Sequence, residues 1–361
     1  MAHACIAGMS DLVGIDRQVA DAAVCRPLPS INIKKQVEAF WQQNPCDSWF
    51  AHGQPGTAAF YQTLDEHRYR VHPQLLSALD LKKTKGLRVL EIGCGCGSEA
   101  ERFARASAHY TAVDLTNAAL TLTRQRFQLA GLQGRFVQGD AENLPFPEGS
   151  FDLVYSHGVL HHTPDTPQTI REVHRVLAPG GSAKIMLYHR NSFNYVINLG
   201  LVRRLRAHLL RTRLGLKLVQ KIWGESARDL QRHAELIQED CGAYLRMQNM
   251  LNRNTDGADN PLSQVFSAAS AKAMFSQFSS VKTEVMFWNP NWLPLLGKFL
   301  PGSLEDRLAS HWGWHLWIYA RKQSQNSPLR KPAGNLDRHR ANEWITRNFS
   351  RQPVTAYSNN Q

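Results

Sequence analysis

Alternating glycines follow a short apolar run near residue 90. The stretch 87–101 reads LRVLEIGCGCGSEAE, and its glycines are Gly93, Gly95 and Gly97. Glycine accepts positive φ and lets a ligand approach the backbone without meeting a Cβ. The pattern predicts a strand, a tight turn that holds a cofactor, and a helix. Ser98 with Glu101 three residues later is typical of a capping box at the start of that helix.

Acidic and polar residues recur where the next predicted strands end. Glu91 stands two residues before the first glycine, and Asp114 ends the second strand. After the third strand come Asp140 and Ala141, and after the fourth come Ser156 and His157. Because an open α/β sheet binds ligands at the carboxyl ends of its strands, we expect these residues to surround one ligand.

The spacing and charge of these residues narrow the choice of cofactor. A dinucleotide site favours GxGxxG, which seats a pyrophosphate on a helix N-terminus. Here the spacing is GxGxG with Glu91 ahead of it, which would repel pyrophosphate and suit a cationic ligand with an α-amino group. Asp114 can accept both hydroxyls of a ribose. A nucleoside that carries a positively charged amino acid meets these demands, and S-adenosylmethionine is such a molecule.

The elements that position these residues alternate between strand and helix. Strands are predicted over 88–92, 110–114, 135–138, 151–156 and 183–187, and helices over 98–106, 116–129 and 167–177. This alternation indicates right-handed βαβ units and a parallel sheet. A further helix over 267–278 and two strands over 281–288 and 314–320 follow later in the chain.

The chain of 361 residues divides by pattern into six segments. We expect a loose N-terminus over 1–30, an N-terminal helical cap over 31–85, a Rossmann-like cofactor-binding core over 86–189, a basic helical insertion or lid over 190–266, a C-terminal helix with the last two core strands over 267–322, and a polar, disordered tail over 323–361. With 43% hydrophobic residues, the chain can form a sizeable core.

The positive charge lies outside the glycine-rich core. The whole chain has a formal charge of +12, whereas residues 86–187 hold nine Lys/Arg against ten Asp/Glu, which gives −1. Residues 193–223 carry seven basic residues and no acidic one, so this segment could be a lid, plain packing or an interfacial helix on anionic lipid. The polar loop 254–261 is too long to be only a turn and could reach a site.

The cysteines and the hydropathy of the chain indicate where in the cell the protein is expected. The six cysteines are scattered, no signal-peptide pattern precedes them, and no uncharged apolar run approaches the roughly 18 residues of a spanning helix. We therefore expect a cytoplasmic protein without structural disulfides, in contact with a membrane at most peripherally.

The chain resembles the class I S-adenosylmethionine-dependent methyltransferases, and within them the small-molecule branch related to ubiquinone and menaquinone biosynthesis. The resemblance rests on VLEIGCGCG, YTAVDLT, GDAENLPFPEGSFDLVYSHGVLHH and HRVLAPGG, which occur in this order. It covers about residues 87–187, a quarter of the chain. It implies a seven-stranded sheet whose last strand is antiparallel, and this accounts for the two late strands.

The resemblance also implies roles for individual residues. The loop that would hold the methionine moiety contains Glu91, Gly93, Cys94, Gly95 and Gly97. The ribose and adenine contacts correspond to Asp114 and Leu115, the adenine-edge contacts to Asp140 and Ala141, and the loop beneath the methionine portion to Ser156 and His157.

A methyl group on a sulfonium is transferred by in-line attack, so the protein must hold the nucleophile opposite the sulfur and exclude water. A hydroxyl or acidic-carbon nucleophile also needs a base. His161 and His162, which follow the fourth strand, are the candidates, and the alternative is that they only shape the loop. We expect no metal: Cys94 and Cys96 lack two further ligands, and the spacing of His157 and His161 lacks a carboxylate partner.

The sequence thus predicts a methyltransferase that acts on a hydroxyl, carbon or amine of a hydrophobic small molecule. The basic charge raises RNA methylation as an alternative, but no Asn/Asp-Pro-Pro-aromatic motif follows the fourth strand. A non-catalytic binding module is the other alternative, and the intact set of Glu91, Asp114 and Asp140 argues against it. The sequence names neither the substrate nor the oligomeric state.

Overall fold

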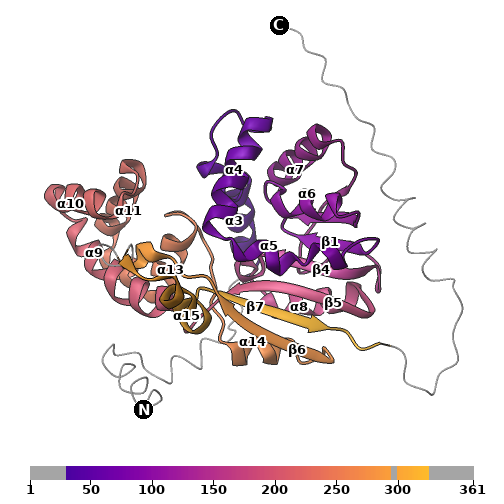
Figure 1. The fold of residues 1–361 in the computed structure, drawn as a ribbon. Helices are drawn as coiled ribbons and strands as arrows, with labels where there is room; N and C mark the ends of the chain where they lie inside the picture. Colours follow the sequence, from indigo (N-terminus) through magenta and orange to yellow (C-terminus); the bar gives the residue numbers. More distant parts are fainter. Residues whose placement is uncertain (1–29, 294–298, 325–361) are drawn as a thin grey trace, which may run out of the picture.

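A computed structural model describes residues 30–293 and 299–324 (Figure 1). The predictions for the N-terminus over 1–30 and the tail over 323–361 fall almost entirely outside the described residues. The described chain starts with a helical segment: α3 (Ser30–Gln43), η1 (Ser48–Phe50), α4 (Ala58–Val71), α5 (Gln74–Leu79) and η2 (Leu81–Lys83).

A seven-stranded sheet follows, in the order β3-β2-β1-β4-β5-β7-β6. Its strands are β1 (Arg88–Ile92), β2 (His109–Asp114), β3 (Arg135–Gln138), β4 (Phe151–His157), β5 (Leu177–Tyr188), β6 (Ser280–Met286) and β7 (His315–Arg321). The first five strands pair in parallel, and β7 lies antiparallel between β5 and β6. The predicted Rossmann-like sheet with an antiparallel last strand is confirmed.

Helices cover both faces of the sheet (Figure 1). The helices that complete the core are α6 (Ser98–Arg105), α7 (Asn117–Ala130), α8 (Thr166–Val176), α14 (Ala268–Met274) and α15 (Gly302–Trp312). One apolar cluster joins α5, α6 and α7 to the sheet, for example through Phe103 and Phe127. A second joins α8 and α14 to the other face, for example through Ile170 and Phe275. Successive residues of a strand enter different clusters, as Leu153 and Val154 of β4 do, and this period of two made the strands predictable.

Strand β5 is longer than predicted. The sequence placed it over 183–187, after a Pro-Gly-Gly stop, but the chain enters the strand directly at Leu177, which pairs with Phe151. The register then shifts so that Leu153 pairs with Ser182. Gly180 has φ +78°, and the Pro-Gly-Gly segment forms a bulge within the strand rather than a loop before it.

The insertion after β5 is helical from Asn194 to Thr255, apart from short connections, and ends in a loop. It comprises η4 (Asn194–Val202, a π-helix), α9 (Arg203–Leu209), α10 (Arg213–Trp223), α11 (Ala227–Glu239), α12 (Cys241–Leu245) and α13 (Met247–Thr255). It has an apolar cluster of its own, which includes Leu210, Val219, Ile237 and Tyr244. In Figure 1, α9, α10 and α11 form a lobe that projects away from the sheet. No helix among the described residues is long and apolar enough to cross a bilayer.

Candidate functional site

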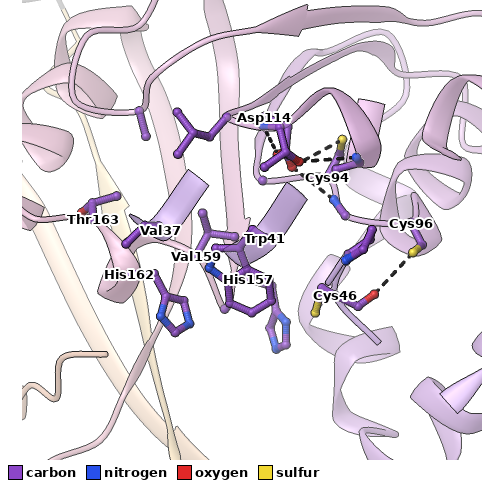
Figure 2. Close-up of a pocket in the computed structure, with 18 of the residues that line it drawn as sticks. Val37, Trp41, Cys46, Cys94, Cys96, Asp114, His157, Val159, His162 and Thr163 are labelled. Atoms are coloured by element: carbon purple, nitrogen blue, oxygen red, sulfur yellow. Dashed lines mark hydrogen bonds between the residues drawn. The ribbon is translucent and has the colours of Figure 1, made fainter. Parts of the chain in front are cut away.

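A cavity opens at the carboxyl ends of β1, β2 and β4, roofed by α3 and α4 (Figure 2). The sequence-predicted residues that line it are Gly93, Cys94, Gly95, Asp114, Leu115, Asp140, Ala141, His157 and His162. Figure 2 shows Asp114 and Cys94 on one side and His162 on the other, with Trp41 and Val159 between them. The cavity is thus lined by strand ends of the core and by two helices from the segment predicted as the N-terminal helical cap.

The glycine turn needs glycine for two reasons. All three residues have positive φ, at 78° for Gly93, 52° for Gly95 and 80° for Gly97. A Cβ on Gly93 would also lie 2.2 Å from Cγ2 of Val159. The turn therefore combines a left-handed backbone with close approach to the loop after β4.

The capping box predicted at Ser98 is wrong. Gly97 is the N-cap residue of α6, and no side chain caps the helix. The Ser98 hydroxyl instead donates to Asp65 of α4 at 2.7 Å, and Glu101 accepts from Arg126 of α7 at 2.6 Å. Tertiary partners bind both side chains, although the helix does begin at Ser98, directly after Gly97, as predicted.

Asp114 is held in place by the turn that follows it. Its Oδ1 accepts hydrogen bonds of 2.9 Å from both the backbone N–H and the hydroxyl of Thr116, while Oδ2 lies 3.4 Å from the N–H of Gly95. Burial raises the pKa of Asp114, and these hydrogen bonds oppose the rise. An oriented carboxylate with one lightly used oxygen on the cavity wall suits a ligand that presents hydroxyl groups.

Asp140 makes an ion pair with the roof of the cavity. The ammonium of Lys34, on α3, lies 2.6 Å from Asp140 and 2.5 Å from Glu142. The carboxylate that the family resemblance assigns to adenine contact is thus paired with a lysine of the helical segment. Lys34 was not a sequence candidate, and nothing in its own neighbourhood signalled this pairing.

Four predicted residues do not line the cavity: Glu91, Gly97, Ser156 and His161. Glu91 is buried and accepts a 2.5 Å hydrogen bond from Tyr110. Burial, reinforced by the nearby Glu99, raises the pKa of Glu91 well above its ordinary value. The Ser156 hydroxyl donates to the carbonyl of Ile92 at 2.9 Å and joins β4 to β1. The roles of Glu91, Gly97 and Ser156 in cofactor binding stay predictions.

The two candidate histidines have different surroundings. His161 is fully buried and stacks on Tyr188 at 3.6 Å, and burial next to His162 holds its pKa well below the ordinary value. His162 lines the cavity, with its ring 5.2 Å from that of Trp41. Its Nδ1 lies 2.6 Å from the carbonyl of Leu262. A carbonyl only accepts, so Nδ1 carries the proton and Nε2 is the basic nitrogen.

Asp256 completes this arrangement and was not a sequence candidate. Its Oδ2 lies 3.6 Å from Nε2 of His162, and its Oδ1 accepts a 2.8 Å hydrogen bond from Tyr188. Asp256 belongs to the polar loop 254–261, whose length indicated that it could reach a site. The loop does so, although no signal in the sequence singled out Asp256.

Arg68 of α4 ties the helical segment to the core. It donates two 2.8 Å hydrogen bonds to Glu99 and pairs with Asp47 at 2.5 Å. It also lies 3.2 Å from Nδ1 of His157. Burial and then the charge of Arg68 hold the pKa of His157 well below its ordinary value, so this ring is neutral. No group of three or more potential metal ligands occurs in the described part of the chain.

Residues 90–185 match the family described as "Methyltransferase domain". Curated relatives match the same region. A phthiotriol/phenolphthiotriol dimycocerosates methyltransferase of Mycobacterium leprae is 48% identical over 98 residues, which is 27% of this chain and 36% of the relative. This region is a class I S-adenosylmethionine-dependent methyltransferase domain. The ubiquinone-related branch stays a prediction, because neither match singles it out.

Similarity to the domain extends to other named proteins. A fatty-acid O-methyltransferase of Mycolicibacterium smegmatis is 46% identical over 99 residues, 27% of this chain and 35% of the relative. The chain therefore spans little more than a third of the length of these relatives.

Solved structures show a distant likeness over more of the chain. Magnesium protoporphyrin IX methyltransferase from Synechocystis, solved with bound S-adenosylmethionine, is 13% identical and matches at a TM-score of 0.45, covering 82% of this chain and 100% of its own. The YcgJ protein of Bacillus subtilis is 21% identical at a TM-score of 0.42, with 70% and 99% covered.

Proposed function

We propose that the whole chain is a methyltransferase that transfers the methyl group of S-adenosylmethionine to a hydrophobic small molecule. The observation that carries the proposal is the cavity of the methyltransferase domain, in which the glycine turn, Asp114 and Asp140 meet at one edge of the sheet. The relatives named for a fatty acid and for phthiotriol lipids support an apolar substrate.

The cofactor residues of this proposal follow the cavity wall. Gly93, Cys94 and Gly95 of the glycine turn would hold the methionine moiety. The ribose would lie at Asp114 and Leu115, and the adenine at Asp140 and Ala141. Bound S-adenosylmethionine supplies an electrophilic methyl group, and the protein's own residues orient the acceptor and exclude water.

Calorimetry with S-adenosylhomocysteine tests the cofactor site. Asp114→Ala removes the oriented carboxylate, and we expect affinity to fall at least about tenfold, since hydrogen bonds to a charged group contribute about 1.5–3 kcal/mol each. Asp259→Ala is the matched control, because the Asp259 side chain is 58% exposed and its ion pair is with Arg232 of α11, away from the cavity lining. No detectable binding by the unmodified protein would overturn the proposal.

We propose His162, rather than His161, as the general base. His162 lies on the cavity wall, whereas His161 does not, and the carboxylate of Asp256 beside Nε2 would stabilise the imidazolium that forms. Nε2 itself is buried in this structure, so the ring would have to turn toward the cavity to meet the acceptor. As the acceptor attacks the methyl carbon, its proton would pass to Nε2. Asp256 acts here as a positioning residue. The base favours a hydroxyl or an acidic carbon over an amine.

Methyl transfer to long-chain alkyl phenols, followed across pH, tests this assignment. We expect His162→Gln to lower kcat about 10²–10⁴-fold with the affinity for S-adenosylhomocysteine unchanged. Asp256→Asn should lower kcat less and shift the pH profile, which a purely structural role would leave in place. Equal activity of His162→Gln and the unmodified protein would remove His162 from the mechanism.

We further propose that residues 193–223 make peripheral contact with an anionic membrane, which would present an apolar substrate to the cavity. The seven basic residues of this segment support it, with no acidic residue among them.

A further inference from the structure

The lobe formed by the insertion exposes a cluster of leucines. They are Leu201, Leu205, Leu209, Leu214 and Leu218, with exposed fractions of 50%, 60%, 39%, 79% and 44%. The described residues contain twelve large hydrophobic side chains that are exposed, and five of them fall within these 18 positions. Single exposed leucines need no explanation, but such a concentration marks a surface that binds something apolar.

The leucines lie on one side of helices that are already packed on the other. Leu201, Leu205 and Leu209 recur every fourth residue along η4 and α9, as Leu214 and Leu218 do on α10, so each set follows one helical face. Residues between them point inward to the cluster of the lobe, as Leu210 and Val219 do. The leucine face is thus a second apolar face, beyond the one that folds the lobe.

Basic residues alternate with these leucines along the segment. Two arginines of the segment point inward, since Arg203 and Arg206 both pair with Glu225. The remaining basic residues make no ion pair with any described residue, and they are Arg204, Arg211, Arg213, Lys217 and Lys221. On α10, Lys217 and Lys221 alternate with the exposed leucines. The face therefore combines apolar side chains with uncompensated positive charge.

We propose that the leucine face of η4, α9 and α10 docks on an anionic lipid bilayer, with the leucines in the acyl boundary and the basic residues at the headgroups. This deepens the proposed function by assigning the partner surface, and it rests on that function. A second copy of the chain is disfavoured as the occupant, because pairing two such faces would oppose positive charges without an acid between them. RNA would use the charge but not the leucines.

The insertion that carries the leucine face also reaches the proposed base. Its last helix, α13, packs against η4 and leads into the loop that brings Asp256 to His162. The docking face and Asp256 therefore belong to one inserted segment, which links the proposed membrane contact to the proposed site.

Vesicle flotation of the full chain tests the docking face. We expect binding to vesicles of phosphatidylcholine with phosphatidylglycerol, and at least tenfold weaker binding to phosphatidylcholine alone. Both Leu214→Ser/Leu218→Ser and Lys217→Gln/Lys221→Gln should weaken binding to anionic vesicles at least tenfold. Leu129→Ser is the control, since Leu129 is 59% exposed on α7, outside the lobe, and this variant should float normally.

Three outcomes would overturn the proposal. One is absence of flotation with anionic vesicles. Another is that the lysine variant loses vesicle binding while the leucine variant keeps it, and that the unmodified protein is retained on immobilised RNA. This result would indicate a nucleic-acid-binding surface. The third is a dimer in solution that the leucine variant dissociates. Calorimetry with S-adenosylhomocysteine separates this proposal from the enzymatic one, because the lobe variants should keep full cofactor affinity.

Discussion

Gly93 must adopt a positive φ and must also leave room for Val159. The two demands can be separated with Gly86, which has φ +73° and nothing within 4 Å of an added Cβ. We expect Gly86→Ala to cost about 1–2 kcal/mol of unfolding free energy for the left-handed backbone alone. Gly93→Ala should cost about 1–3 kcal/mol more, because the branched Val159 side chain is stiff. Urea unfolding of both variants measures the difference, and equal losses would refute the packing constraint.

Glu91 makes stability depend on pH. Burial raises its pKa above the ordinary 4.5, so below that pH the folded and unfolded states both hold the proton and no penalty arises. As pH rises, the unfolded chain ionises first, and the folded state loses stability by up to about 1.4 kcal/mol per pH unit until its raised pKa is reached.

Glu91→Gln should therefore stabilise the protein, by an amount that grows from pH 5 to pH 8. The Gln carbonyl can still accept the hydrogen bond from Tyr110. Urea midpoints at several pH values measure the gain, with Glu148→Gln as the control because that side chain is 76% exposed. A gain that is constant with pH would show that the Glu91 carboxylate is ionised throughout.

At the scale of elements, α4 is held to α6 by Arg68. Its side chain is 10% exposed, and removing it leaves the carboxylates of Glu99 and Asp47 without their main partner. We expect Arg68→Ala to cost about 3–5 kcal/mol of unfolding free energy, as for other buried pairs that lose one member. Arg105→Ala, which breaks a pair whose arginine is 57% exposed, should cost less than about 1 kcal/mol. Thermal and urea unfolding measure both variants, and similar losses of stability in Arg68→Ala and Arg105→Ala would contradict the anchoring role of Arg68.

The strands and helices of the sheet could be predicted because the sheet is buried on both faces, which places apolar residues at regular positions in the sequence. The first strand and the third match the predicted limits, and apolar residues of α8, such as Ile170 and Val173, are fully buried. The length of β5 could not be predicted, since Leu177 joins the strand only through its pairing with Phe151.

Site residues could be predicted only where they stand at or just after the end of a predicted strand. Asp114, Asp140 and His162 follow strands and line the cavity. Lys34 reaches the cavity from a position 106 residues away from its partner Asp140, and Asp256 reaches His162 from a position 94 residues away. Such contacts depend on how the helices dock. No local pattern encodes a docking geometry, so these residues appear only in the structure.

At the scale of the molecule, three segments distant in sequence meet around one cavity. The core supplies the glycine turn and His162, α3 supplies Val37 and Trp41, and the loop after α13 places Asp256 beside His162, 3.6 Å from its Nε2, without lining the cavity itself. The leucine face, on η4, α9 and α10, contributes nothing to the cavity wall. Ligand binding in the cavity and docking on a bilayer should therefore protect different helices from solvent.

Hydrogen exchange can follow both events in one protein. S-adenosylhomocysteine should slow exchange in the glycine turn and in α3, because a ligand adds contacts to Val37 and Trp41, and it should leave α10 unchanged. Anionic vesicles should slow α9 and α10 and leave α3 unchanged, since Leu205 and Leu214 would lose access to water. Slowing of α10 by the ligand alone would mean that the lobe closes on the cavity as a lid, and an unchanged α3 would remove the helical roof from the site.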